Sequence, residues 1–144
     1  MADVGEFFIR LVRAETLLYN AVDARLQADF GLSLGQLQFL QIVARRGTTR
    51  VLDLATEVGI TVGATSKAVD RLVERGWAER AANPDDRRSS LLTLTRSGSA
   101  LLMRATRVFE AELTARLRGV VTDAELTRTT AALAALHASL AVDR

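Results

Sequence analysis

The hydrophobic period of the chain changes at Gly76, inside residues 54–98, which read LATEVGITVGATSKAVDRLVERGWAERAANPDDRRSSLLTLTRSG. Before Gly76, apolar residues recur three and four positions apart, as they do on one face of an α-helix. After it, Trp77–Arg80 and Ser89–Thr95 have the composition of short strands, and Asn83–Asp86 between them has that of a turn. The stretch therefore predicts a helix followed by a two-stranded hairpin.

Helical periodicity extends to both sides of this stretch. Capping boxes at Ser33–Gln36 and Thr122–Glu125 mark two further helix starts, because each pairs a hydroxyl with an amide or carboxylate side chain three residues later. The expected elements are helices at 5–30, 33–47, 51–58 and 61–76, the hairpin at 77–95, a helix from 95 or 97 to about 119, and a last helix from 122 onward. The predicted fold class is mainly α, with a small two-stranded antiparallel wing.

Composition restricts the chemistry open to the protein. The 144 residues are rich in Ala, Leu and Val, which suits one helical domain. The chain has no cysteine and one histidine, so disulfides and thiol chemistry are excluded and neither a metal nor a cofactor is expected. No apolar run reaches the roughly 18 residues of a membrane span, and the N-terminus lacks a basic signal-peptide start. We therefore expect a cytoplasmic protein.

Two short helices joined by a glycine turn and followed by a hairpin describe a winged helix-turn-helix, whose second helix can enter a DNA major groove. Small residues at the start of that helix permit close approach, and its hydroxyl and basic side chains suit phosphates and base edges. Arginines at the hairpin tip suit a narrow minor groove. The predicted DNA-contacting residues are Thr61, Val62, Gly63, Ala64, Ser66, Lys67 and Arg71 on the helix and Asp86, Arg87 and Arg88 on the tip.

Other interpretations of these positions stay open. The net charge of +2 neither requires nor excludes nucleic acid, and charged helical faces are usually only solvated surface. The tip could be a soluble loop shaped by an Asp86–Arg88 bridge, although such a bridge could also aim the arginine. A winged helix can also serve protein–protein contact without DNA binding. The outward face of 62–71 argues against that alternative, because its residues are small, hydroxylated or basic rather than large and apolar.

An enzyme is not expected, and no catalytic residue is assigned. Asp85 and Asp86 are neighbours on a turn, which lacks the buried setting that separates two carboxyl pKa values. His137 falls on the alanine-rich last helix, where packing or solvent contact is the simpler role. The sequence contains no cysteine nucleophile, glycine-rich phosphate loop or metal-ligand spacing.

The last helix predicts self-association. Its wide apolar face includes Ala132, Leu133, Ala135, Leu136 and Leu140. This face is wider than a small winged lobe can cover, so it needs a partner. A second copy of the chain would cover it in a two-fold dimer, and an intramolecular helical layer is the alternative.

Residues 54–98 resemble the MarR family of bacterial transcription regulators. The family's wing pattern is Asp-Pro-x-Asp-Arg-Arg, followed by Leu-Thr and a glycine. Here it stands as Asn83–Arg88, Leu94–Thr95 and Gly98, with Asn83 in place of the commoner aspartate. The resemblance implies a ligand-responsive repressor that binds a pseudo-palindromic operator in double-stranded DNA as a homodimer.

The resemblance also divides the chain. It implies that the first and last helices of two subunits interlock. The whole chain, 1–144, would be a single MarR-like subunit, with a winged DNA-binding lobe at 33–98 and dimerisation helices at 5–31 and 99–144. The recognition helix falls on Val62–Arg75, and the family's Asp-x-Arg wing pair falls on Asp86 and Arg88, with the arginine in the minor groove.

A cleft between the dimer base and the lobe is a further implication of the resemblance. It would bind a small aromatic or anionic effector. The residues that could line it are Tyr19, Phe39 and Arg107. Phe39 also suits the core, and Arg107 also suits the open surface.

Overall fold

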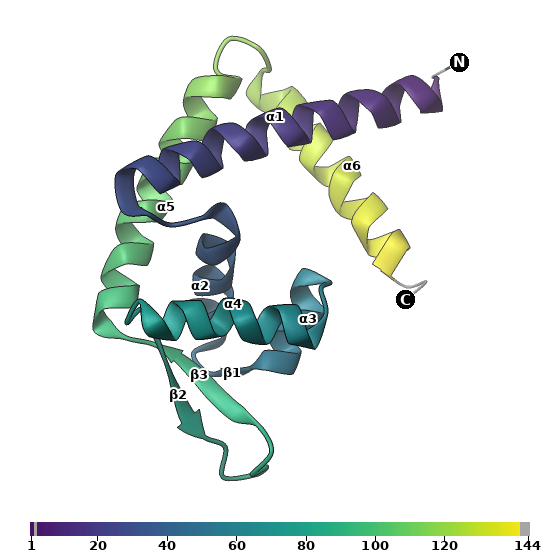
Figure 1. Ribbon diagram of the computed structural model, residues 1–144. Helices are drawn as coiled ribbons and strands as arrows, with labels where there is room; N and C mark the ends of the chain where they lie inside the picture. The colour runs from purple at the N-terminus through teal and green to yellow at the C-terminus, as the bar shows by residue number, and fades with distance from the viewer. Residues whose placement is uncertain (2, 142–144) are drawn as a thin grey trace. The chain divides into compact units, whose positions relative to one another are not determined.

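The computed structural model describes residue 1 and residues 3–141 (Figure 1). Its elements are α1 (Val4–Phe30), α2 (Leu34–Arg46), β1 (Thr49–Arg50), α3 (Val51–Val58), α4 (Val62–Glu74), β2 (Ala78–Ala82), β3 (Ser90–Leu94), α5 (Arg96–Leu117) and α6 (Asp123–Ala141). The chain divides into two compact units, Met1–Glu110 and Ala111–Arg144. The first unit contains the sheet, α1 to α4 and most of α5, and the second contains α6.

The helices begin and end close to where the sequence predicts, because local hydrogen bonds define their ends. At the start of α2, Ser33 Oγ accepts from Gln36 N at 3.1 Å, and Gln36 Oε1 accepts from Ser33 N at 2.9 Å. This confirms the predicted capping box. At the end of α3, Gly59 adopts the left-handed conformation, with φ of 78°, which glycine reaches at no steric cost. The mainly α fold class is thus confirmed.

The sheet has three strands rather than the expected two. In the hairpin, β2 pairs antiparallel with β3, with Ala78 opposite Leu94 and Ala82 opposite Ser90. The short strand β1 pairs with the other edge of β3, which gives the order β1-β3-β2. The strand β1 could not be predicted from the sequence, because two residues are too few to show the alternation of apolar and polar side chains that marks a strand. The hairpin itself projects away from the helices as a wing (Figure 1).

The first predicted strand was placed too early along the chain. Trp77 lies before β2, and its amide donates to Leu72 O at 3.0 Å, which closes the end of α4. Its carbonyl accepts from Thr95 N at 3.1 Å. Trp77 is therefore part of the connection between helix and wing rather than the first residue of the strand.

The core of the first unit comes from α1 to α4 and the sheet. Its largest fully buried apolar side chains are Val22, Leu26, Leu32, Leu37, Leu40, Val43, Leu54, Val69, Leu72 and Leu92. Val22 and Leu26 belong to the second half of α1, and Leu101 and Ala105 of α5 are buried as well. The packed unit therefore includes parts of α1 and α5, two of the helices that the sequence assigns to dimerisation.

The start of α5 is packed tightly against the connection before the wing. Thr95 Oγ1 accepts from Gly98 N at 2.9 Å and donates to Gly76 O at 2.6 Å. A Cβ added to Gly98 would lie 1.8 Å from the carbonyl oxygen of Trp77. No side chain fits at that distance, so residue 98 must be glycine for the helix to start where it does.

The second unit is dominated by α6. Thr122 and Glu125 form the predicted capping box, in which Glu125 Oε2 accepts from Thr122 N and Oγ1, both at 2.8 Å. These two bonds hold the pKa of the Glu125 carboxyl below its usual range. None of the described residues of α6 is buried, and Leu133, Leu136 and Leu140 are exposed.

Candidate nucleic-acid interface

The helix α4 has one buried face and one free face. Thr61 caps it, because its Oγ1 accepts from Ala64 N at 3.2 Å. Thr65, Val69 and Leu72 form the buried face, which packs against α3 and β2. The predicted DNA-contacting residues Thr61, Val62, Gly63, Ala64, Lys67 and Arg71 are exposed, and Ser66 is half-buried. The structure thus brings all seven to one surface of one short helix.

The wing turn between β2 and β3 is held by the side chain of Asn83. This residue is only 8% exposed. Its Oδ1 accepts from Asp85 N at 3.0 Å, and its Nδ2 donates to Ser89 Oγ at 3.0 Å. An aspartate could make the first bond but has no proton to donate in the second. Asparagine at this position therefore satisfies both ends of the turn.

Asp86 contacts Arg88 through the main chain. Its Oδ1 accepts from Arg88 N at 2.9 Å, which is a charge-assisted hydrogen bond to a backbone amide. The sequence allows a bridge between the two side chains, whereas this contact is to the backbone amide of Arg88. The Arg88 side chain is exposed, and Asp86 fixes the backbone from which it extends.

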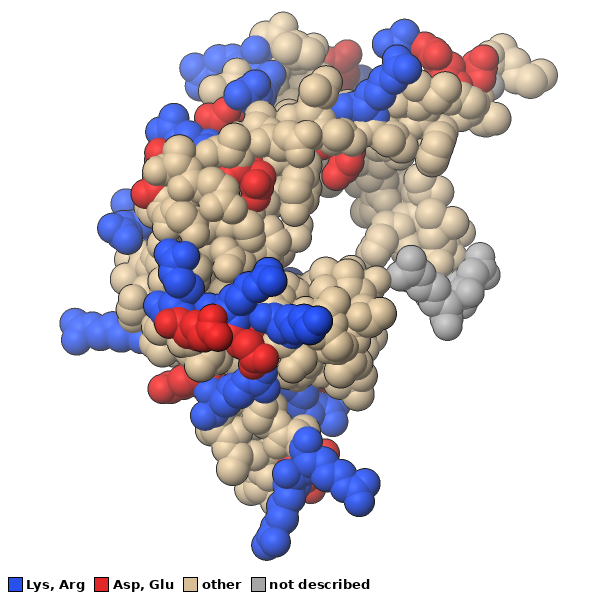
Figure 2. All heavy atoms as spheres, in the orientation of Figure 1, with Lys and Arg blue, Asp and Glu red and all other residues tan. Residues whose placement is uncertain are grey.

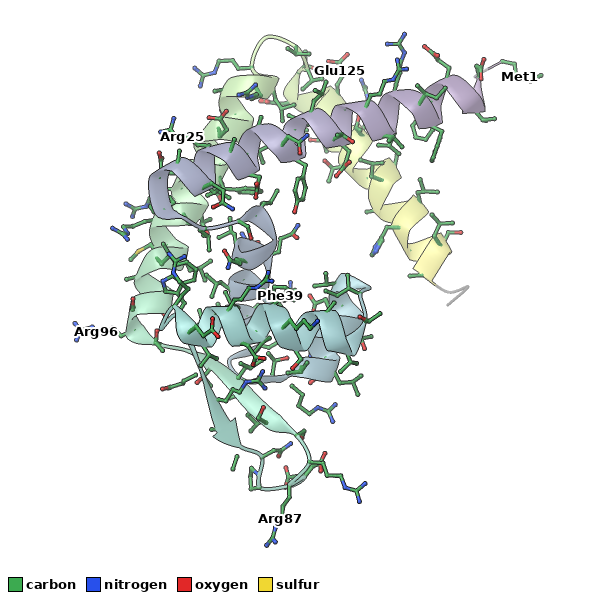
Figure 3. All side chains as sticks on the ribbon, in the orientation of Figure 1. Met1, Arg25, Phe39, Arg87, Arg96 and Glu125 are labelled. Carbon is green, nitrogen blue, oxygen red and sulfur yellow. The ribbon has the colours of Figure 1, made fainter. Side chains whose placement is uncertain are left out.

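Basic side chains gather at the free end of the wing (Figure 2). Arg87 extends from this end away from the helices (Figure 3). Arg87 and Arg88 are both exposed, and each belongs to the turn that Asn83 and Asp86 hold. The tip therefore presents two cations on a fixed backbone.

A clamp that the sequence does not predict joins the wing to α4. Arg80 on β2 donates from Nη2 to Asp70 Oδ1 at 2.6 Å and from Nη1 to Ser90 Oγ at 3.0 Å. These bonds join α4, β2 and β3. The available signal was Asp70, an acid on an otherwise basic helix face, but its partner lies 10 positions away and only the fold pairs them.

A second anchor holds the C-terminal end of α4. Arg75 donates from Nη1 to the carbonyl of Gly31 at 3.3 Å, where α1 has just ended. Its guanidinium lies 4.2 Å from the centre of the Trp77 ring, a distance typical of a cation–π contact. The helix α4 is thus attached to the wing through Asp70 and to the end of α1 through Arg75, while its outer face stays free.

A further basic residue lies beside the wing. Arg50 precedes α3 and donates from Nη2 to Asp53 Oδ1 at 2.9 Å. This hydrogen bond raises the pKa of Arg50, with a smaller contribution from the Asp86 charge, and it lowers the pKa of the Asp53 carboxyl. Arg50, Asp53 and Asp86 line one hollow next to Pro84. The sequence gives no reason to select Arg50, because it lies outside both the predicted recognition helix and the predicted wing.

The three candidate effector contacts are less clearly grouped. Tyr19 is exposed on α1, Phe39 is buried in α2, and Arg107 is exposed on α5. Phe39 therefore takes the core role that the sequence left open (Figure 3). Within residues 1 and 3–141, no group of three or more His, Asp or Glu side chains could hold a metal ion. None of the helices in the described part of the chain is long and apolar enough to cross a membrane.

Comparison with known proteins places this winged helix in a family. The MarR family model matches residues 32–90, from the start of α2 to the start of β3. The multiple antibiotic resistance protein MarR of Salmonella typhimurium is 27% identical over 107 residues, which cover 70% of this chain and 74% of that protein. The winged lobe of this chain, residues 32–90, is therefore similar to the MarR family. The chain is a DNA-binding transcription regulator, and the relatives found are regulators rather than enzymes.

Solved structures match the fold of almost the whole chain. A MarR family transcriptional regulator from Streptomyces coelicolor, in complex with DNA, matches with a TM-score of 0.86 and 25% identity, covering 97% of this chain and 90% of that one. A MarR variant from E. coli, in complex with operator DNA, matches with a TM-score of 0.78 and 23% identity, covering 94% and 99%. The second likeness concerns the fold alone.

Proposed function

We propose that two copies of this MarR-family chain bind a pseudo-palindromic operator, each with α4 in a major groove and its wing in the adjoining minor groove. The observation that carries this proposal is the free face of α4, attached through Asp70, Arg80 and Ser90 to a wing that ends in two exposed arginines. One rigid unit then contacts two grooves at a fixed spacing. The similar regulator from Streptomyces coelicolor was solved in complex with DNA, which supports DNA binding by this fold.

Each site residue has a role in this proposal. Lys67 and Arg71 contact phosphates, which gives charge-dependent affinity, and Ser66 donates to a phosphate or a base edge. Arg88 enters the minor groove with Asp86 fixing its backbone, and Arg87 contacts the flanking phosphates. Thr61, Gly63 and Ala64 form the narrow start of the helix, which lets its backbone approach the DNA.

The homodimer rests on apolar surface in both long terminal helices. Phe7, Phe8 and Leu17 are exposed on α1, and Leu133, Leu136 and Leu140 are exposed on α6. Such surface needs a partner, and a two-fold dimer is the commonest way to cover it. It also matches a two-fold operator, whose half-sites lie about 34–36 Å apart on one face of the duplex. The division into a lobe at 33–98 and dimerisation helices at 5–31 and 99–144 belongs to this proposal.

Regulation by a small aromatic or anionic effector is part of the same proposal, and its support is the similarity to the MarR family. The effector would shift the spacing of the two lobes and so weaken operator binding. We propose no enzymatic activity, because the exposed acids of the wing turn serve its shape, as Asp86 does for Arg88. Protein–protein contact without DNA is the alternative function, and one exposed apolar residue on α4, Val62, is the observation in its favour.

Selection of bound fragments from random and genomic DNA by the purified protein tests the proposal. We expect one enriched inverted repeat, with half-sites centred one helical turn apart. Analytical ultracentrifugation should then show two chains alone and two chains per operator duplex. The absence of any enriched sequence would refute a sequence-specific regulator, and a single chain on an asymmetric site would refute the dimer.

A further inference from the structure

Val62 is the most unusual residue on the free face of α4. It is the first residue of the helix, and it is 49% exposed. The rest of the exposed face carries small, hydroxylated or charged residues. A large apolar side chain at the part of a recognition helix that meets base edges calls for an apolar partner.

Gly63 leaves open space beside Val62. Its φ does not lie in the left-handed region, and a Cβ added to it would have no atom of the described residues within 4 Å apart from its two chain neighbours and the nearby backbone of its own helix. The fold therefore does not need glycine here, although glycine is a poorer helix former than alanine. The open position instead permits a close approach by a molecule outside the chain.

The hydroxyl of Thr61, which precedes Val62, already has a hydrogen-bond partner within the helix. The hydroxyl oxygen of Thr61 accepts from Ala64 N, and Ala64 itself ends in a methyl group. The exposed side-chain surface of Val62, Gly63 and Ala64 is therefore carbon. Polar and charged side chains begin only with Ser66 and Lys67, one turn further along the helix.

Only one group on the major-groove edges of the bases matches this surface. Thymine carries a C5-methyl group there, whereas the other bases present hydrogen-bond donors and acceptors. We infer that the first turn of α4 selects a thymine in each operator half-site, with the methyl group packed against Val62 and the close approach allowed by Gly63. This inference rests on the proposed function, since it names what the same helix recognises.

Deoxyuridine substitution isolates the methyl group, because uracil lacks it and keeps the hydrogen-bonding edge of thymine. The probes are duplexes of the selected operator, in which each thymine of the repeat is replaced in both half-sites, one position at a time. We expect one position at which binding weakens about fourfold per half-site, the change that corresponds to burying one methyl group. Other positions should bind as the parent operator does.

Variants of Val62 assign the effect to this residue. Val62→Ala should weaken binding of the parent operator and abolish the difference between thymine and uracil at the sensitive position. Val58→Ala is the matched control, because Val58 is also an exposed valine but ends α3. It should retain the full thymine preference.

The outcomes separate the inference from the proposed function. If the operator binds but the Val62→Ala variant keeps every thymine–uracil difference, the inference is overturned and the regulator stands. The same holds if no thymine position is sensitive. If no duplex is bound specifically at any salt concentration, both the inference and the proposed function are overturned.

Discussion

The starts of α4 and α5 look alike in sequence and differ in what surrounds them. In each, a threonine precedes the helix, and its hydroxyl oxygen accepts a hydrogen bond from the backbone amide three residues later. Thr61 accepts from Ala64 before α4, and Thr95 accepts from Gly98 before α5. Each first turn also contains a glycine. Gly98 meets the carbonyl of Trp77, whereas Gly63 faces open space. The same local signature is therefore packed against the fold at α5 and left open at α4, where we propose that DNA approaches.

The largest expected effect is on the free energy of unfolding, at Gly98. Gly98→Ala should destabilise the protein by more than about 4 kcal/mol, because a Cβ would overlap the main chain of Trp77, which cannot move without shifting the wing. Gly63→Ala is the control and should change the free energy of unfolding by no more than about 1 kcal/mol. Urea denaturation followed by circular dichroism measures both. Equal stability of the two variants would contradict the difference in packing between Gly98 and Gly63.

The next effect concerns binding at the wing. Arg88→Ala should weaken operator binding by about 1–3 kcal/mol and lower the salt slope by about one ion, since one minor-groove cation is lost. The free energy of unfolding should not change, because Arg88 is exposed. Titration of labelled operator at several salt concentrations measures the effect. Arg118→Ala, which removes a charge from an exposed position in the turn before α6, is the control. An unaffected Arg88 variant would contradict the wing assignment.

A bulkier residue at the start of α4 sharpens the contrast between the two glycines. Gly63→Gln should leave the free energy of unfolding nearly unchanged, because open space surrounds the position. It should weaken operator binding by roughly 1.4 kcal/mol or more, a factor of ten, since the side chain keeps the helix from the groove. Denaturation and operator titration of one protein sample give both values. Loss of folding would show that this end of α4 also supports the core.

The smallest effect distinguishes shape from charge at the wing tip. Asp86→Ala should weaken operator binding by about 0.5–1.5 kcal/mol, because the Arg88 amide loses its acceptor, even though a negative charge near DNA is removed. Asp86→Asn retains an oxygen acceptor and should bind at least as tightly as the parent protein. Tighter binding by the alanine variant would mean that Asp86 acts on DNA only through its charge.

The helix order, the caps and the wing could be predicted from the sequence, because their determinants lie a few residues apart. Thr61, Ser33 and Thr122 each satisfy amides within their own first turn. The missed features depend on residues that only the fold brings together. Gly98 meets Trp77, and Asp70 meets Arg80 across the joint between α4 and β2. A spacing of residues gives no sign of such contacts, and the two-residue strand β1 was too short for any pattern.

The open surroundings of Gly63 and Val62 have a consequence for how such proteins diversify. The buried residues of α4 are Thr65, Val69 and Leu72, and Gly63 has open space around it, so we expect substitutions in the first turn of α4 to preserve folding. After gene duplication, one copy can therefore acquire a new set of target promoters through a few substitutions at 62–64, while the start of α5 stays invariant. We therefore expect descendants of one ancestor to share Gly98 and to differ most at residues 62–64.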